Sequence, residues 1–294
     1  MKEKFVSVDG IRTRYIESES DGNNARQPML LIHGGHFGRY DSADDWGLNI
    51  DSLGKNFKVY AIDKIGQGFT DNPRSDGEYL IGSTVKHAFG FVKTLGLQKV
   101  NVVGHSRGGY AATRVALEHP EAFATLTIVD SSTLMTPPNP IYEQWDREAE
   151  KIADTRAKLK YLVAANSYSD RHVTEDYVDA MEKIWKQPKI KEAQAKMKSG
   201  LMKIFKADVV ERQNEAQEWI RKGGLKNCPT LVMWAYNDPS ATMDTCGVPC
   251  MNLIMPNVPE SRMHIVNHAG HFCYREQPEE FEAVLTYFVR RYGR

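Results

Sequence analysis

The segment 100–117 constrains the fold of this chain more than any other part of it. A run rich in β-branched residues leads into residues 104–108, Gly-His-Ser-Arg-Gly, and an alanine-rich helical pattern follows directly. A turn this tight between a strand and a helix leaves no room for a side chain at Gly104 or Gly108, and it forces Ser106 into a strained backbone conformation. We therefore expect the hydroxyl of Ser106 to project above a sheet, beside the first amides of the helix.

Strand and helix patterns alternate along most of the remaining chain. Residues 4–16 alternate apolar and polar around Asp9-Gly10, which is typical of a β-hairpin. Further strands are predicted at 29–32, 57–63, 125–130, 230–235 and 262–266, and helices at 83–95 and from about residue 278. Because several of these strands are apolar throughout, the pattern predicts an α/β fold with a mainly parallel, twisted sheet and helices on both faces.

The composition changes after residue 134. Residues 136–140, Thr-Pro-Pro-Asn-Pro, form a rigid break, and the sequence up to about residue 226 is helical and rich in Lys and Glu. Helices are expected there near 141–157, 158–167, 174–187, 189–205 and 207–222. Because the strand pattern then resumes, we expect residues 1–135 and 227–294 to form the core, with residues 136–226 inserted as a helical lid. A separate interaction domain is the less favoured alternative.

Charge, hydropathy and cysteine content argue against several classes of protein. Lys plus Arg and Asp plus Glu both total 38, and this balance argues against a nucleic-acid partner. The first residues do not resemble an apolar leader and no apolar run approaches membrane-spanning length, so we expect a soluble, cytoplasmic protein without a membrane partner. Of the four cysteines, Cys246 and Cys250 have the spacing of half a metal site, but no second Cys/His pair completes it. We expect free thiols, no metal and no cofactor.

A serine hydroxyl is almost fully protonated at neutral pH, so Ser106 needs a neighbouring base to act as a nucleophile. His271 is the preferred base, because it lies in a loop between the strand at 262–266 and the last helix. His268 is the near rival. The other histidines considered either precede or adjoin Ser106, or alternate with core residues and are expected to be structural: His33, His36, His105 and His264.

The base in turn needs a carboxylate that holds its tautomer and stabilises the imidazolium. Asp238 follows the strand at 230–235 and is the preferred candidate, although an aspartate before a proline is also common in ordinary turns. The order Ser106, Asp238, His271 is the one expected for a serine on a turn of this type. Asp130 and Asp244 are the alternatives.

A tetrahedral oxyanion needs backbone N–H donors. The amide of Arg107, directly after the serine, is one candidate. A second is expected from the loop 33–36, His-Gly-Gly-His, where glycine lets the backbone approach a substrate. Gly35 is the first choice for this donor and His36 the second.

Taken together, these motifs resemble the α/β-hydrolase superfamily. The resemblance rests on His33-Gly34-Gly35, Asp63-x-x-Gly66-x-Gly68, residues 104–109, Asp238 and Gly270-His271, and it extends over nearly the whole chain. Within the superfamily, residues 63–71 and the placement of the lid most resemble the meta-cleavage product hydrolases. These cofactor-free enzymes split carbon–carbon bonds in the ring-fission products of aromatic compounds.

The sequence departs from that narrower family at three places. His36-Phe37-Gly38 stands where the family often has Gly-Pro-Gly, Phe272 stands where it often has Trp, and Met181 aligns with its lid arginine for the substrate carboxylate. Another cation would have to replace that arginine, and Arg107, Arg39 and Arg171 are the candidates. The expected substrate contacts are Gly34, His105, Arg39, Arg171, Met181 and Phe272.

The sequence therefore predicts a serine hydrolase with a lidded, largely apolar pocket. The leading reaction is carbon–carbon hydrolysis of a 2-hydroxy-6-oxo-dienoate-type compound, with a small carboxylesterase as the alternative and a ligand receptor on this fold as a remote one. Dehalogenases and epoxide hydrolases of the superfamily use an aspartate nucleophile, whereas position 106 is Ser. The expected partner is a small molecule, and the sequence leaves a homo-oligomer open.

Overall fold

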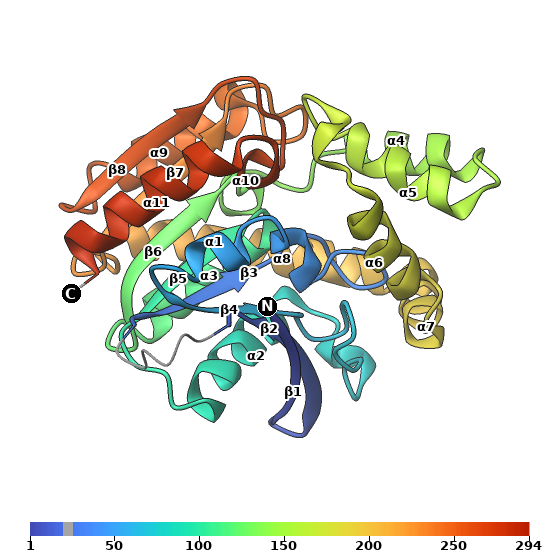
Figure 1. Ribbon diagram of the computed structural model, residues 1–294, viewed down its shortest axis with the longest axis horizontal. Helices are drawn as coiled ribbons and strands as arrows, with labels where there is room; N and C mark the ends of the chain where they lie inside the picture. Colours follow the sequence, from blue (N-terminus) through green and yellow to red (C-terminus); the bar gives the residue numbers. More distant parts are fainter. Residues whose placement is uncertain (20–25, 294) are drawn as a thin grey trace.

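The computed structural model describes residues 1–19 and 26–293, and eight strands of these residues form one sheet (Figure 1). The order across the sheet is β1-β2-β4-β3-β5-β6-β7-β8. The strands are β1 (Lys2–Val8), β2 (Ile11–Glu17), β3 (Pro28–Ile32), β4 (Lys58–Ile62), β5 (Val100–His105), β6 (Phe123–Val129), β7 (Thr230–Ala235) and β8 (Ser261–Val266). From β4 to β8 every neighbouring pair is parallel, which confirms the predicted mainly parallel sheet.

The first two strands form the predicted hairpin. β1 and β2 pair antiparallel from Val8 opposite Ile11 to Lys2 opposite Glu17. The turn residues Asp9 and Gly10 both have positive φ, 48° and 80°, which is the backbone of a tight turn that follows the twist of the strands. β2 then joins the sheet by pairing antiparallel with β4.

Alternate residues of each central strand serve two apolar cores, one on each face of the sheet. Val102 packs in one cluster with residues of α2 (Ile81–Thr94) and α3 (Arg107–Glu118). Val103 packs in the other, with residues of α1 (Ile50–Leu53) and α11 (Pro278–Tyr292). Burial on both faces is the reason these strands are largely apolar. The core also contains three helices that were not predicted: α1, α9 (Val248–Ile254) and α10 (Cys273–Glu276).

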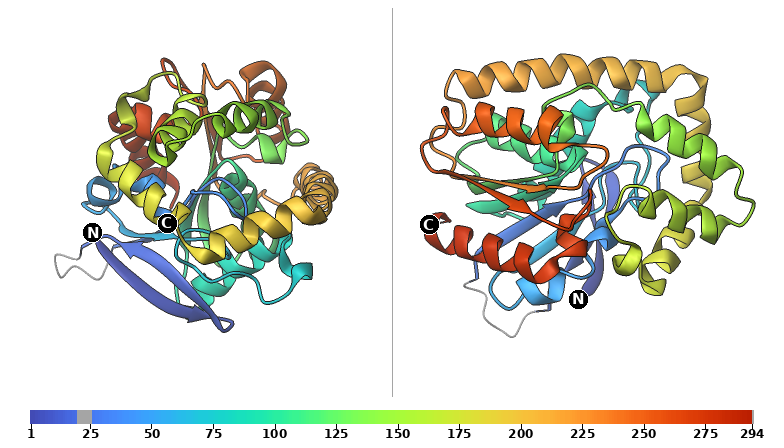
Figure 2. Two further views of the ribbon diagram at one scale, coloured as in Figure 1. Left: turned by 90° about the vertical axis from the view of Figure 1, so that its right-hand side faces the viewer. Right: turned by 90° about the horizontal axis from the view of Figure 1, so that it is seen from above.

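The segment between β6 and β7 is helical, as predicted, and contains two differently placed parts. Helices α4 (Ile141–Glu150), α5 (Thr155–Ala164), α6 (Glu175–Trp185) and α7 (Pro188–Lys196) lie at one end of the sheet (Figure 1). Helix α8 (Met202–Arg221) instead runs along the core and packs on α2 and α3 (Figure 2). The backbone bends sharply between α7 and α8, at Gly200, where φ is 126°.

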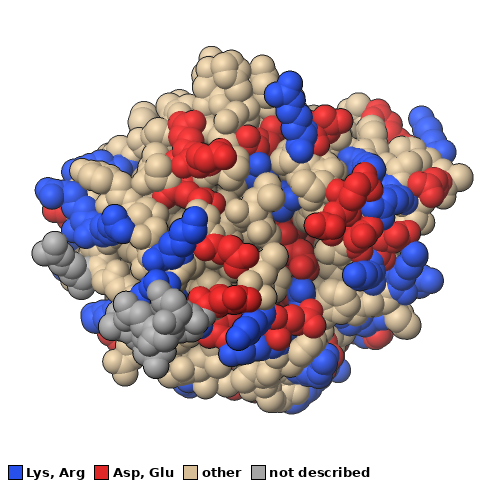
Figure 3. Space-filling view, viewed as in Figure 1, with Lys and Arg blue, Asp and Glu red and all other residues tan. Residues whose placement is uncertain are grey.

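The structure also bears on the expectations about charge, membrane-spanning segments and cysteines. Acidic and basic residues are interspersed on the face shown in Figure 3, in keeping with the balanced totals of 38 each. No helix of the described residues is long and apolar enough to cross a membrane. All four cysteines are buried and free, as predicted.

Candidate active site

Ser106 occupies the strained turn that the sequence predicts. It lies between β5 and α3 with φ 54° and ψ −122°, and its side chain is almost fully buried. A Cβ added at Gly104 would lie 2.1 Å from the carbonyl oxygen of Gly108, and one added at Gly108 would lie 2.2 Å from that of Ile32. Backbone atoms cannot move aside as a flexible side chain can, so only glycine fits on either side of the serine.

His271 and Asp238 come from different loops and are joined by a short hydrogen bond. His271 Nδ1 lies 2.6 Å from Asp238 Oδ2. The other carboxyl oxygen, Oδ1, accepts the backbone N–H groups of Ser240 and Ala241 at 2.8 Å each, which fixes the carboxyl group. Because a carboxylate only accepts hydrogen bonds, the proton of a neutral His271 is assigned to Nδ1, and the lone pair is then on Nε2.

Ser106 and His271 line the same cavity, which has a volume of about 180 Å³. In the part of the chain that the structure describes, no hydrogen bond joins the Ser106 hydroxyl to His271. The backbone N–H of His271 donates to the carbonyl oxygen of Asn166 at 2.9 Å, so residues after α5 hold the histidine loop in place. Ser106 and His271 therefore meet at one cavity, and Asp238, which does not line it, is joined to His271.

The rival histidines lie elsewhere or are already engaged. His268 is exposed, and its ring lies beside Tyr168 at a separate surface depression. His105 lines the cavity but is buried, with Nε2 2.7 Å from the carbonyl oxygen of His271. Burial lowers the pKa of His105 well below its ordinary value. His33 is also buried, and its pKa is lowered in the same way.

Of the two rival carboxylates, Asp130 is buried close to Asp238 and Asp244 is exposed. Asp130 Oδ1 accepts the N–H of Ala235 at 2.7 Å. Burial, and then the neighbouring charge of Asp238, raise the pKa of Asp130 well above its ordinary value. Of the two buried carboxyl groups, Asp238 is the one that bonds to His271.

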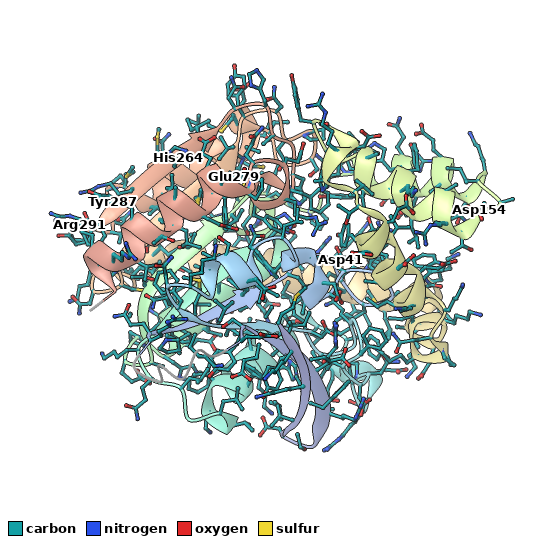
Figure 4. All side chains as sticks on the ribbon, in the orientation of Figure 1. Asp41, Asp154, His264, Glu279, Tyr287 and Arg291 are labelled. Carbon is teal, nitrogen blue, oxygen red and sulfur yellow. The ribbon has the colours of Figure 1, made fainter. Side chains whose placement is uncertain are left out.

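Three backbone N–H groups near Ser106 are free, in the part of the chain that the structure describes. They belong to Gly35, His36 and Arg107, the residues predicted to bind an oxyanion. Gly35 has a φ of 72°, and a Cβ there would lie 2.0 Å from a carboxyl oxygen of Asp41. Asp41 faces the same cavity, on the side of the core that meets the helical insertion (Figure 4).

The three candidate arginines differ in their surroundings. Arg107 faces the cavity half-buried, and within the described residues it makes no ion pair and no hydrogen bond. Its guanidinium carbon lies 5.9 Å from the centre of the Phe205 ring, and burial lowers the pKa of Arg107. Arg39 also lines the cavity but is paired with Asp146 of α4 at 2.5 Å. Arg171 is exposed at the depression that contains His268, away from the cavity.

Of the remaining predicted substrate contacts, some lie at the cavity and one does not. Phe272 and His105 line the cavity, and Gly34 lies directly behind it, where a Cβ would lie 3.1 Å from the Cβ of Ser106. Met181 is buried within the apolar cluster around α6 and does not line the cavity. Side chains of the insertion that the sequence analysis did not single out line it instead, among them Tyr142, Trp145, Leu162, Asn166 and Met202.

Those residues were missed because their contacts are made between helices far apart in the sequence. Tyr142 Oη donates to Ser240 Oγ at 2.9 Å, which links α4 to the loop of Asp238. A second cavity, of about 600 Å³, shares His36 and Arg39 with the first and continues beneath α5 and α7. In residues 1–19 and 26–293, no group of three or more His, Cys, Asp or Glu side chains is placed to hold a metal ion.

A sequence model of the α/β-hydrolase fold matches residues 27–278. The chain belongs to the α/β-hydrolase family. It is 28% identical to a 2-hydroxy-6-oxo-6-(2'-aminophenyl)hexa-2,4-dienoic acid hydrolase of Metapseudomonas resinovorans, over 98% of this chain and 91% of that protein. It is 33% identical to a 2-hydroxymuconate semialdehyde hydrolase of Pseudomonas sp. strain CF600, over 97% and 92% of the two chains.

A solved structure extends the comparison to three dimensions. The crystal structure of a serine hydrolase involved in carbazole degradation superimposes on this α/β hydrolase with a TM-score of 0.74 and 23% identity, over 99% of each chain. At that identity the likeness shows the fold alone. The predicted resemblance to the α/β hydrolases, and among them to the meta-cleavage product hydrolases, is confirmed by the sequence relatives. This protein is therefore a hydrolase.

Proposed function

We propose that this α/β hydrolase uses Ser106 as a nucleophile, His271 as its base and Asp238 as the group that orients His271. The observation that carries the proposal is the hydrogen bond between His271 and Asp238 beside the cavity that Ser106 enters. His271 Nε2, whose lone pair is free, takes the proton of the Ser106 hydroxyl during attack and later gives it to the leaving group. Helices α4 to α7 of the segment 136–226 form the lid over the cavity, whereas α8 packs on the core.

The proposed reaction is hydrolysis of a carbon–carbon bond in a 2-hydroxy-6-oxo-dienoate. In its keto form, such a compound presents a carbonyl carbon to Ser106. Attack forms a tetrahedral oxyanion that the amides of Arg107 and of Gly35 or His36 would stabilise. The C5–C6 bond then breaks, its electron pair delocalises into the remaining keto acid, and His271 supplies the proton. Water releases the acyl group from Ser106 as a carboxylic acid. The two sequence relatives, a dienoic acid hydrolase and a 2-hydroxymuconate semialdehyde hydrolase, support this choice.

Arg107 is the proposed partner of the substrate carboxylate. Arg107 lines the cavity and, within the described part of the chain, makes no ion pair with an acidic residue. Arg39 also lines the cavity but is paired with Asp146. A half-buried guanidinium without an acceptor gains charge-assisted hydrogen bonds when a carboxylate enters beside it. A neutral ester offers no such gain.

The test compares an acidic dienoate with a neutral aryl ester in Arg107→Gln. We expect KM for the acid to rise about tenfold or more, roughly 1.4 kcal/mol, while KM for the ester changes little. Arg171→Gln is the matched control, because its side chain lies away from the cavity, and it should change neither KM. Ser106→Ala should abolish turnover of both substrates.

Two outcomes would redirect the proposal. If Arg39→Gln and not Arg107→Gln discriminated between the acid and the ester, the carboxylate would bind at the Arg39–Asp146 pair. If neither variant did so and the wild type turned over only the ester, the protein would be a carboxylesterase with the same Ser106 chemistry.

A further inference from the structure

Lys64 is a buried cation beneath the loop that contains Gly35 and His36. It follows β4, and only 1% of its surface is exposed. Lysine is almost never fully buried without a paired charge, because removing an ammonium group from water costs several kcal/mol. Burial lowers the pKa of Lys64 to about 7, and the negative charge of Asp41 opposes this shift. A residue this costly to bury calls for a specific role.

The hydrogen-bond partners of the ammonium group are two backbone carbonyl groups. Nζ of Lys64 donates to the carbonyl oxygen of Gly34 at 2.7 Å and to that of Gly35 at 3.1 Å. In the described part of the chain, Lys64 makes no ion pair with a carboxylate. The backbone N–H of Lys64 also donates to His33 Nε2 at 3.2 Å, so His33 carries its proton on Nδ1, which lies 2.9 Å from the same Gly34 oxygen.

These two carbonyl groups belong to the peptides that supply the N–H groups of Gly35 and His36, and both residues line the cavity that Ser106 also lines. The carbonyl of Gly34 shares its peptide with the N–H of Gly35, and the carbonyl of Gly35 shares its peptide with the N–H of His36. In a trans peptide the two groups point in opposite directions, and the described chain contains no cis peptide. A donor that holds both carbonyls on one side therefore turns both N–H groups to the other side, away from Lys64, which does not line the cavity.

Glycine makes this support necessary. The peptide between Gly34 and Gly35 has no side chain on either neighbour, so its rotation meets little steric resistance. Inside a low-dielectric site, a bond from an ammonium group to a carbonyl oxygen also polarises the peptide and strengthens its N–H as a donor. Both effects favour an oxyanion over the planar carbonyl of the bound substrate.

We propose that Lys64 is a positioning residue for the oxyanion hole, which fixes the Gly34–Gly35 and Gly35–His36 peptides through their carbonyl groups. The inference rests on the proposed function, because an oxyanion forms only if Ser106 attacks a carbonyl carbon. Lys64 does not itself touch the substrate. Its removal acts on the transition state, since removing one oxyanion donor lowers kcat by about 10²- to 10³-fold.

The primary test is Lys64→Met, which retains the length and bulk of the side chain without its donors. We expect kcat to fall about 10- to 100-fold, less than for outright loss of a donor, with KM changed by less than threefold. Lys189→Met is the matched control. Nζ of Lys189 also binds carbonyl oxygens, of Thr70 at 2.6 Å and Gln67 at 3.5 Å, but on a part of the loop after β4 that does not line the cavity. It should leave kcat within twofold.

A second measurement separates positioning from a general loss of structure. A trifluoromethyl ketone forms a tetrahedral adduct with a serine hydroxyl and needs the oxyanion hole, whereas the carboxylic acid product does not. Lys64→Met should weaken inhibition by the ketone by the same factor as kcat/KM and leave inhibition by the product unchanged. If the Met variant does not fold, Lys64→Gln, which retains a single short donor, should show the same pattern at smaller size.

The activities of Ser106→Ala and Lys64→Met together distinguish an error about Lys64 from an error about the proposed function. If Ser106→Ala is inactive while Lys64→Met retains kcat within threefold, the role of Lys64 is disproved and the serine mechanism stands. The same conclusion follows if ketone and product inhibition weaken equally. If Ser106→Ala retains turnover, the proposed function fails, and the inference about Lys64 fails with it.

Discussion

At the scale of single residues, two buried carboxylates lie close together but only Asp238 bonds to His271. Asp238→Asn can present an amide N–H to Nδ1 and so favour the wrong tautomer of His271. We expect kcat to fall by roughly 10³-fold or more, with the fold retained. Steady-state kinetics with either substrate measure the loss, and circular dichroism checks the fold.

Asp130→Asn is the control for this change, because Asp130 accepts a backbone N–H of Ala235 and makes no bond to the histidine. It should lower kcat by less than tenfold. If Asp130→Asn lowered kcat by about 10³-fold and Asp238→Asn remained active, Asp130 and not Asp238 would be the carboxylate that orients His271.

At the scale of elements, the insertion is fastened to the core by a buried polar contact. Tyr177 of α6 donates from Oη to Asp45 Oδ1 at 3.0 Å. Arg275 of α10 stacks on the Tyr177 ring at 3.7 Å and donates to the carbonyl oxygens of Asp45 and His172 at 2.8 and 3.0 Å. These contacts connect α6 and the turn before it to two elements of the core.

Tyr177→Phe should therefore loosen α6. It leaves a buried carboxyl oxygen without its donor, which costs about 1–3 kcal/mol of unfolding free energy. Urea unfolding measures the loss, and faster hydrogen exchange in α6 than in α2 would locate it. Tyr161→Phe, which removes a bond to Glu148 within the insertion, is the control and should cost less than about 0.5 kcal/mol. Equal effects of the two variants would contradict a fastening role for Tyr177.

At the scale of the whole molecule, buried neutral histidines make the fold sensitive to acid. Burial lowers the pKa of His87 and of His172 to about 3. When the pKa of a histidine is lower in the folded than in the unfolded state, its contribution to stability is complete only above the pKa of the unfolded chain, where both states are neutral. Below the ordinary value of 6.5 the unfolded chain binds the proton first, so stability falls as the pH falls.

His87 offers a direct measurement, because it lies on α2, remote from the cavity, and contacts Thr13 Oγ1 through Nε2 at 2.8 Å. In His87→Gln the difference in unfolding free energy between pH 7 and pH 5.5 should shrink by about 1.3 kcal/mol. Guanidinium unfolding at the two pH values gives the difference. His268→Gln, whose ring is exposed, should leave the difference as it is in the wild type. A His87→Gln profile parallel to the wild type would show that His87 titrates equally in both states.

The features that the sequence predicts correctly are those specified by local patterns. The turn at Ser106, the hairpin at Asp9-Gly10 and strand β7 follow from glycine spacing and from apolar periodicity. The expected helix 141–157 ends instead at Glu150, because Asp154 caps the next helix by accepting the N–H of Ala157. The composition rich in Lys and Glu continues through this boundary and hides it.

The features that were missed depend on partners distant in the sequence. Lys64 follows an apolar strand and Asp63, a pattern equally typical of a solvent-exposed turn. Its role depends on the loop after β3, some thirty residues earlier, which folds over the ammonium group. Tyr177 and Asp45 are separated by 132 residues. No periodicity within either segment indicates that the two will meet.

The contacts of helix α8 determine which segment of this enzyme can be replaced by that of a relative in a chimera. Asp208 of α8 accepts the first free N–H of α2, from Ile81, at 2.8 Å, and Gln213 donates to the carbonyl oxygens of Thr133 and Thr136. The last third of the segment between β6 and β7 thus completes the layer of helices behind Ser106. A chimera that swaps residues 136–226 as one block would also replace α8 and break these contacts with the core. The segment that can be exchanged ends at the bend near Gly200. Recombination at that bend would change the insertion side of the cavity and leave the core with Ser106, Asp238 and His271 intact.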